Sequence, residues 1–252
     1  CGMAGHSKWS KIKRKKGAND VARSKVFSRL VKEITVAARE GGGDPAGNAR
    51  LRTAIDAAKA ENLPGNNIDN AIKRGTGEMP GVVYEEVMFE GYGPGGVAIM
   101  VKATTDNRRR TVPEMRKIFE KAGGNMSEQG SVGWMFKQTG LFVVGASTIE
   151  EDDLLMIALE AGADDVSVQE DVYEILAPPH DFHVVSQALD EAGVEVMSRE
   201  LAMLPQNTIG LEGREAERCV RLMETLDDHD DVQNVWTNAD ISEEVAEQAA
   251  AG

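Results

Sequence analysis

The residues whose types best suit ligand binding lie near the start of the sequence. They are six basic side chains with one aromatic ring among them. Lysine and arginine crowd the stretch from residue 8 to residue 16, and no acidic residue occurs before Asp20. Such a density of like charge repels itself unless an anion lies nearby, and lysines beside an aromatic ring suit phosphate binding and base stacking. We therefore expect this basic arm to bind a polyanion through Lys8, Trp9, Lys11, Lys13, Arg14, Lys15 and Lys16.

A second row of basic residues lies on the helix predicted to follow the arm. Apolar residues recur from Phe27 to Ala38 with the i, i+3, i+4 spacing of an amphipathic helix, so one face is expected to be buried. The opposite face is expected to meet a polyanion or water. We predict that it extends the phosphate-binding surface of the arm through Lys25, Arg29, Lys32 and Arg39.

Three consecutive arginines form a third candidate contact. Arg108, Arg109 and Arg110 are expected in a loop, because Thr111 and Glu114 match a capping box that would start a helix running to about residue 121. The loop is either a solvated helix entry or a second phosphate contact, since surface charge is common and helix N-termini favour anions.

Patterns typical of catalysis are scarce in this sequence. It contains no P-loop, zinc-protease or nucleophile-elbow motif. Gly91, Gly93 and Gly96 match the dinucleotide-binding pattern, but a predicted strand follows them instead of the required helix, which favours a hairpin turn. His180 and His183 have a spacing that could serve a metal, yet two preceding prolines favour an exposed helix start. We predict no catalytic residue, no metal site and no cofactor.

Charge is distributed unevenly along the chain. Residues 1–80 hold 16 Lys and Arg against 8 Asp and Glu, whereas residues 81–252 hold 12 against 34. The overall net charge of −14 therefore conceals a basic module attached to an acidic body. This asymmetry predicts a nucleic acid as the partner of the N-terminal part.

The cysteine count and the hydropathy of the chain predict the cellular compartment of the protein. Cys1 and Gly2 precede Met3 and are interpreted as an expression remnant, which leaves Cys219 as the one native cysteine. A single cysteine cannot form a disulfide framework and favours a reducing compartment. No apolar run reaches the length of a membrane span, and the basic N-terminus lacks the apolar core of a secretory signal. We expect a cytoplasmic protein with no membrane partner.

Hydrophobic periodicity predicts an α+β protein with an N-terminal helical bundle and two α/β domains of the ferredoxin-like, split βαβ type, the third inserted in the second. The predicted domains are a basic helical domain (1–79), a discontinuous α/β domain (80–138 and 206–240), an inserted βαββαβ domain (139–205) and an acidic tail (241–252).

Particular elements follow from the same patterns. In the helical domain, Asn66 and Asn67 are candidate caps of a third helix that ends before Gly75. The discontinuous domain is predicted to contain strands at 82–90, 97–104, 131–137 and 232–237, with helices at 112–121 and 212–226. The inserted domain is predicted to contain helices at 149–160 and 182–191.

Several motifs together make the sequence resemble the YebC family across residues 3–240. They are Met3–Trp9, Gly42–Pro45, Ala54–Asp56, Ala71–Gly75, Glu90–Gly96, Thr105–Arg108, Gly130–Val132 and Trp134–Phe136. The resemblance implies a helical N-terminal domain and two α/β domains, the last inserted in the middle one. It also implies a role in gene expression, since bacterial members are described as DNA-binding transcriptional regulators and related members act on the ribosome.

The sequence and the resemblance together predict a non-enzymatic nucleic-acid-binding regulator of gene expression, most simply a transcriptional regulator that binds DNA through residues 3–79. The alternative is a translation factor that contacts ribosomal RNA with the same basic surface, either as an activator or by relieving stalls at proline-rich sequences. Phosphate contacts carry no sequence information, so they do not separate these two functions. A cofactor-dependent enzyme that uses the glycine-rich loop is the least favoured class.

Overall fold

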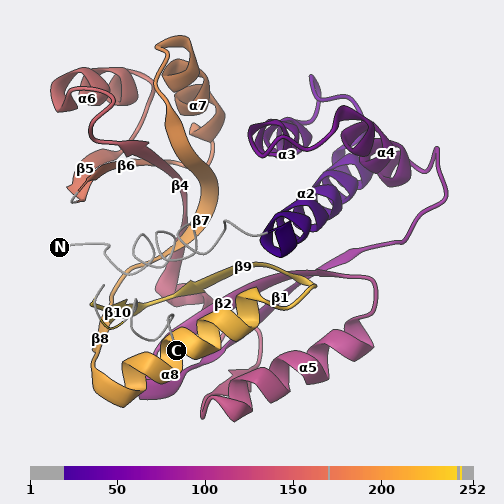
Figure 1. Cartoon of the computed structure of the whole chain (residues 1–252), viewed down its shortest axis with the longest axis vertical. Helices are drawn as coiled ribbons and strands as arrows, with labels where there is room; N and C mark the ends of the chain where they lie inside the picture. The colour runs from indigo at the N-terminus through magenta and orange to yellow at the C-terminus, as the bar shows by residue number, and fades with distance from the viewer. Residues whose placement is uncertain (1–19, 170, 243–244, 246–252) are drawn as a thin grey trace. The chain divides into compact units, whose positions relative to one another are not determined.

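The computed structural model describes residues 20–169, 171–242 and 245. It has an α+β architecture, as the sequence predicted, and it divides into two compact units. Of the described residues, those before 137 and after 204 form one unit, and those from 137 to 204 form the other. Figure 1 shows the elements of both units.

Three helices of the first unit form a small bundle: α2 (Asp20–Gly41), α3 (Ala49–Ala60) and α4 (Gly65–Thr76). Its core is built from the apolar stripes that the sequence predicted, with Ile34, Leu51 and Ala71 fully buried. Asn48 fixes the connection between α2 and α3. Its side chain accepts a hydrogen bond from the Leu51 amide at 3.0 Å and donates to the carbonyl of Gly42 at 2.8 Å.

The bounds of α4 differ from the prediction in two respects. Asn66 and Asn67 lie inside the helix, because the chain already turns at Pro64, which occupies the N-cap position. Gly75 does not end the helix. A Cβ at Gly75 would lie 2.7 Å from the Cβ of Ala38, so the glycine allows α4 to cross closely over α2. The helix ends at Thr76, and Gly77, with a left-handed φ of 82°, is its C-cap.

The rest of the first unit is an antiparallel sheet with two helices on one face. The strand order is β3-β1-β2-β9, and α5 and α8 lie side by side against the sheet (Figure 1). The elements are β1 (Glu85–Tyr92), β2 (Ala98–Thr105), α5 (Arg108–Lys121), β3 (Asn125–Ser127), α8 (Gly213–Asp227) and β9 (Val232–Thr237). A short parallel pair, β8 (Ile209–Leu211) and β10 (Ala239–Ile241), completes this part of the unit.

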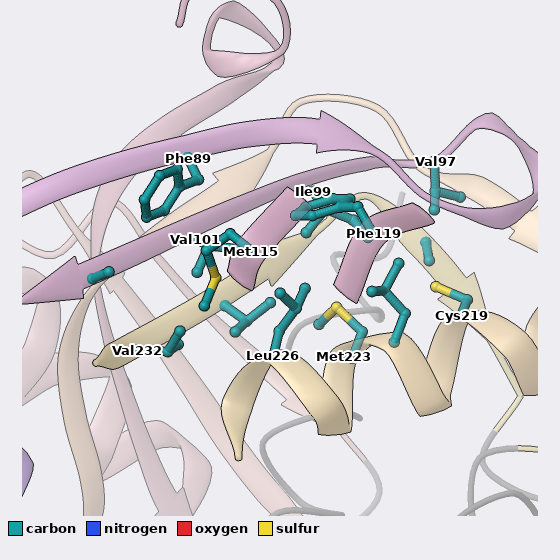
Figure 2. Close-up of a cluster of buried hydrophobic side chains, with 14 of the residues drawn as sticks. Phe89, Val97, Ile99, Val101, Met115, Phe119, Cys219, Met223, Leu226 and Val232 are labelled. Atoms are coloured by element: carbon teal, nitrogen blue, oxygen red, sulfur yellow. The ribbon is translucent and has the colours of Figure 1, made fainter. Parts of the chain in front are cut away.

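A single apolar core joins this sheet to its two helices. Figure 2 shows Phe119 of α5 and Met223 and Leu226 of α8 pointing toward Ile99 and Val101 of β2. Residues of β2 alternate between this core and the opposite face, as the two-residue period of a strand requires. The helix at 212–226, far along the chain from the first strands, is therefore part of the same core.

The predicted strand at 131–137 is wrong. Residues 133–135 form a short 3-10 helix, and the strand beside β1 is β3 at residues 125–127. The physical reason is Glu90, whose buried carboxylate accepts hydrogen bonds from the amides of Gly130 and Val132 at 2.8 Å and of Gly133 at 2.7 Å. Those amides bind a side chain and cannot join a strand ladder. Trp134 is 70% exposed, whereas Phe136 is buried.

The glycine-rich stretch forms a turn between β1 and β2, as the strand pattern predicted. Gly95 and Gly96 have left-handed φ angles of 70° and 76° inside the short 3-10 helix Pro94–Gly96. Gly93 has a φ of −95°, so it is required for space instead: a Cβ there would lie 2.8 Å from the side chain of Ile99. The turn leads directly into a strand and opens no helix.

The second unit has the strand order β5-β6-β4-β7. Pairing of β4 with β6 and of β5 with β6 is antiparallel, which is the split βαβ arrangement that the sequence predicted. Helices α6 and α7 pack in one core with the sheet, where the rings of Phe142 and Phe182 stack at 4.8 Å. The elements are β4 (Phe136–Gly145), α6 (Glu151–Glu160), β5 (Asp165–Gln169), β6 (Val172–Ala177), α7 (Phe182–Glu191) and β7 (Val196–Pro205).

Candidate nucleic-acid interface

The basic face of α2 meets an acidic segment, residues 227–231, which ends α8 and leads into β9. Lys25 Nζ lies 2.8 Å from Asp228 Oδ1, and Arg29 Nη1 lies 3.3 Å from Asp227 Oδ1. Both side chains also donate to the main-chain carbonyls of these aspartates. The last carbonyls of a helix lack partners within it and carry partial negative charge, so two cations of α2 cap the C-terminus of α8.

Lys32 and Asp231 form the most buried ion pair of this contact. Lys32 Nζ lies 3.1 Å from Asp231 Oδ1 and also donates to the carbonyls of Thr104 at 3.2 Å and Asp230 at 2.9 Å. The Lys32 side chain is only 13% exposed and that of Asp231 only 4%. All three donors of the ammonium group are therefore used within the chain.

The second oxygen of Asp231 gathers donors from β2 and α5. It accepts from Thr105 Oγ1 at 3.1 Å, from Thr111 Oγ1 at 2.8 Å and from Arg110 Nη2 at 2.6 Å. Burial alone would raise the pKa of Asp231, but the hydrogen bonds from Arg110, Thr111 and Lys32 outweigh it and lower the pKa to about 2. Asp231 thus stays ionised and links α2 to the sheet and to α5.

The expectation of an open basic face on α2 is therefore wrong for three of its four residues. Lys25, Arg29 and Lys32 pair with the acidic segment 227–231, about 200 residues along the chain. The pattern of the helix shows which residues share a face, but not what that face contacts. A role for these three residues in binding a nucleic acid stays a prediction, and it requires carboxylates to be displaced.

Arg39 lies apart from this cluster. It occupies the last turn of α2, where its side chain is exposed, and it forms no ion pair within the described part of the chain. Lys25, in the first turns of the same helix, lies 14 residues earlier, which is about 21 Å along an α-helix. Arg39 is therefore available to an external anion.

The three arginines lie inside α5, not in a loop. The helix begins at Arg108, because the side chain of Asn107 caps it by accepting from the Arg110 amide at 3.2 Å. Arg108 and Arg109 are exposed, whereas Arg110 turns toward Asp231. The structure thus brings Arg110 together with Lys32 at one carboxylate and leaves its two neighbours free for solvent or a ligand.

The basic arm lies outside the described residues. The predicted contacts that fall there are Lys8, Trp9, Lys11, Lys13, Arg14, Lys15 and Lys16.

A second ionic cluster, which the sequence did not predict, joins α2 and α3 to the sheet. Arg50 contacts Glu33 at 2.8 Å and both Glu40 and Glu86 at 2.6 Å. Burial would lower the pKa of Arg50, but the carboxylates of Glu86 and Glu33 outweigh it and raise that pKa. Arg50 is therefore held in structural contacts.

Four further basic side chains, absent from the predicted set, line a groove between α5 and α8: Lys117, Lys121, Arg218 and Arg221. The i, i+4 spacing on one helix and the i, i+3 spacing on the other place each pair on one helical face. That signal was present in the sequence, but finding the groove also required knowing that the two helices pack together.

The histidines and the cysteine were also considered as metal ligands or nucleophiles. Within the described residues there is no group of three or more His, Cys, Asp and Glu side chains placed to hold a metal ion. His180 Nε2 lies 3.2 Å from Asp181. Burial raises the pKa of the Cys219 thiol to about 12, so it is a core residue and not a nucleophile. Among the described helices, none is both long and apolar enough to cross a membrane.

Comparison with known proteins finds two family models that together match nearly the whole chain. A family model described as the TACO1/YebC protein N-terminal domain matches residues 7–78, and one described as the TACO1/YebC second and third domain matches residues 84–239. The chain belongs to the TACO1/YebC family. The second model spans both the sheet with its two helices and the second unit, which agrees with the continuity of the sheet across the insertion.

Relatives in this family match over almost their full lengths. A probable transcriptional regulatory protein of Desulfatibacillum aliphaticivorans is 57% identical over 242 residues, covering 96% of this chain and 98% of the relative. One from Geobacter sulfurreducens is 55% identical over 246 residues, covering 98% and 99%. The crystal structure of a conserved hypothetical protein from Aquifex aeolicus has 44% identity and a TM-score of 0.81, covering 88% of this chain and 92% of that one.

Proposed function

We propose that this member of the TACO1/YebC family is a nucleic-acid-binding regulator of gene expression, most simply a cytoplasmic transcriptional regulator that binds DNA. The observation that carries the proposal is the segregation of charge: residues 1–80 hold 16 basic and 8 acidic side chains in a chain of net charge −14. Relatives more than 50% identical over nearly their whole length are named probable transcriptional regulatory proteins, which supports the regulatory role.

The contacts of the described residues bear on which basic side chains this proposal uses. Lys25, Arg29 and Lys32 are engaged by aspartates, so the proposal relies mainly on the positive charge of the arm, whose residues lie outside the described part of the chain. Six cations within nine residues can neutralise several phosphates and release condensed counterions. Exposed Arg39, Arg108 and Arg109 add further contacts. We assign no catalytic residue and no cofactor.

Crosslinking in cells tests the proposal. The full chain, and a variant with Lys11, Lys13 and Lys15 replaced by glutamine, would be crosslinked and the DNA that co-purifies sequenced. We expect discrete enriched fragments with the native chain and their loss in the variant at equal protein abundance. Recovery of DNA with no enrichment over a mock sample would contradict transcriptional regulation.

The same basic surface also suits ribosomal RNA, because phosphates are common to both polymers. Gradient sedimentation of a cell extract separates the two functions. Comigration with ribosomes that survives DNase treatment would favour a translation factor, and absence from every ribosomal fraction would favour DNA.

A further inference from the structure

A groove of about 680 Å³ lies between α5 and α8, on the side of the helices away from the sheet core. Lys117 and Lys121 line it from α5, and Arg218 and Arg221 line it from α8. Figure 1 shows the two helices side by side along this face of the sheet. We name this feature the α5–α8 groove. We propose that it binds the sugar-phosphate backbone of a nucleic acid as a second contact, an inference that rests on the proposed function.

Within the part of the chain that the structure describes, the cations of the groove have no carboxylate partner. Within the described residues, Lys117, Lys121 and Arg221 form no hydrogen bond or ion pair through their side chains. Arg218 donates one Nη2 bond to the Ala122 carbonyl at 2.8 Å, which leaves most of its guanidinium donors available. This contrasts with Lys25, Arg29, Lys32 and Arg50, each of which is paired with an acid.

The acidic group at one end of the groove is already engaged. Glu114 Oε2 lies 3.1 Å from His229 Nε2 and 3.7 Å from Arg110 Nε. Among the described residues that line the groove, the four cations therefore face one carboxylate, Glu114, which is engaged elsewhere, and neighbouring like charges destabilise a helix surface. Because the chain as a whole is strongly acidic, this arrangement is not a consequence of general basicity.

The chemistry of the lining favours a phosphate backbone. Leu222, which also lines the groove, is almost fully buried, whereas the four cations are exposed. Guanidinium groups bind phosphate oxygens in a planar, two-bond geometry, and the lysines add point charges. No Phe, Tyr or Trp is among the residues that line the groove, and the imidazole of His229 lies 3.1 Å from Glu114 Oε2, so we expect contacts here to be independent of sequence.

A pair of matched variants of the full chain tests the groove. The groove variant replaces Lys117, Lys121 and Arg221 with glutamine and leaves Arg218 in place, because its bond to Ala122 supports the end of α5. The control variant replaces exposed Lys59, Arg116 and Lys137 with glutamine, none of which lines the groove. Both variants change the net charge equally, so any difference between them reports position and not total charge. Circular dichroism and melting temperature establish that both are folded.

Binding to a duplex DNA fragment would be measured by fluorescence anisotropy over a range of salt. We expect the groove variant to bind more weakly and to flatten the slope of log K against log salt by roughly 2 to 3, about 0.9 for each phosphate that is no longer neutralised. The control should keep the native slope to within about 0.9. Equal slopes for the groove variant and the native chain would overturn the groove while leaving the proposed function intact.

Two other outcomes can be distinguished from failure of the groove proposal alone. If the native chain itself binds neither duplex DNA nor ribosomal RNA, the proposed function fails, and the groove proposal fails with it. If the groove variant loses affinity for a poly-glutamate probe but keeps its nucleic-acid slope, the groove binds an acidic peptide and the phosphate proposal is wrong.

Discussion

Asp231 connects three elements through one carboxylate, so its removal should lower the stability of the first unit. Replacing it with alanine removes one acceptor of the Lys32 ammonium and of the hydroxyls of Thr105 and Thr111, and it leaves the Lys32 charge without its carboxylate. We expect the free energy of unfolding to fall by about 3 kcal/mol, the range for breaking a buried charged contact. Urea denaturation measures this change. Replacing Asp230, whose side chain is exposed, is the control and should cost less than about 0.5 kcal/mol.

The same carboxylate predicts a pH dependence. The pKa of Asp231 is lowered from 3.8 to about 2 in the folded chain, so its contribution to stability is complete above about pH 4 and is lost as the pH falls toward 2. The difference in unfolding free energy between the native chain and Asp231→Asn should therefore shrink across this window. A constant difference between about pH 5 and about pH 2.5 would show that the charge of Asp231 is not what stabilises the contact.

The glycine-rich turn between β1 and β2 gives a prediction at the scale of an element. Gly95 and Gly96 both have left-handed φ angles, but a Cβ at Gly95 would collide with the side chain of Leu211, whereas the space beside Gly96 is open. Gly96→Ala should lower stability by about 1 kcal/mol from backbone strain alone, and Gly95→Ala by clearly more. Thermal denaturation of the two variants compares them. Equal losses would mean that the contact with Leu211 is unimportant.

Elements with a strong local signal were predictable from the sequence. The helix at 182–191 and the strand at 232–237 have the predicted bounds, because periodicity and flanking turn residues act within a few positions. The error at 131–137 arose from Glu90, a side chain some 40 residues earlier that binds three amides. The prediction at Gly75 was wrong for a similar reason, since its role is close packing between α2 and α4. Long-range contacts of this kind leave no local pattern.

The candidate site could likewise be predicted only in part from the sequence. The sequence placed Lys25, Arg29 and Lys32 on one face of a helix, and the structure confirms that they share a face. It also shows that distant aspartates cover this face, which helical periodicity could not indicate. The i, i+4 and i, i+3 spacing of the cations in the α5–α8 groove is visible in the sequence. That these cations line one groove could not be predicted, because it depends on how two helices far apart in the sequence pack together.

At the scale of the whole molecule, the acidic body is expected to restrain the basic N-terminal part. Asp227 and Asp228 form ion pairs with Arg29 and Lys25, two of the cations that the sequence predicted to bind phosphate. In the full chain, replacing both with asparagine should tighten duplex binding at about 50 mM salt, and the gain should fade near about 0.3 M as screening shortens the Debye length.

A control for this restraint replaces exposed Glu150 and Glu151 with glutamine, which changes the net charge by the same amount. Anisotropy titrations at the two salt concentrations compare the variants. If the Asp227 and Asp228 variant gains no more affinity than the control, the aspartates exert only a general electrostatic effect. If it binds more weakly than the native chain, the contact supports the binding surface instead of covering it.

The salt dependence of duplex binding by the arm tests the central claim most directly. The variant has glutamine in place of Lys11, Lys13, Arg14, Lys15 and Lys16, and the native full chain is the reference. If the arm provides the main phosphate contacts, the slope of log K against log salt should flatten by roughly 3 to 5, at about 0.9 for each phosphate that is no longer neutralised. A slope equal to that of the native chain would contradict the claim that this protein binds nucleic acid through its basic arm.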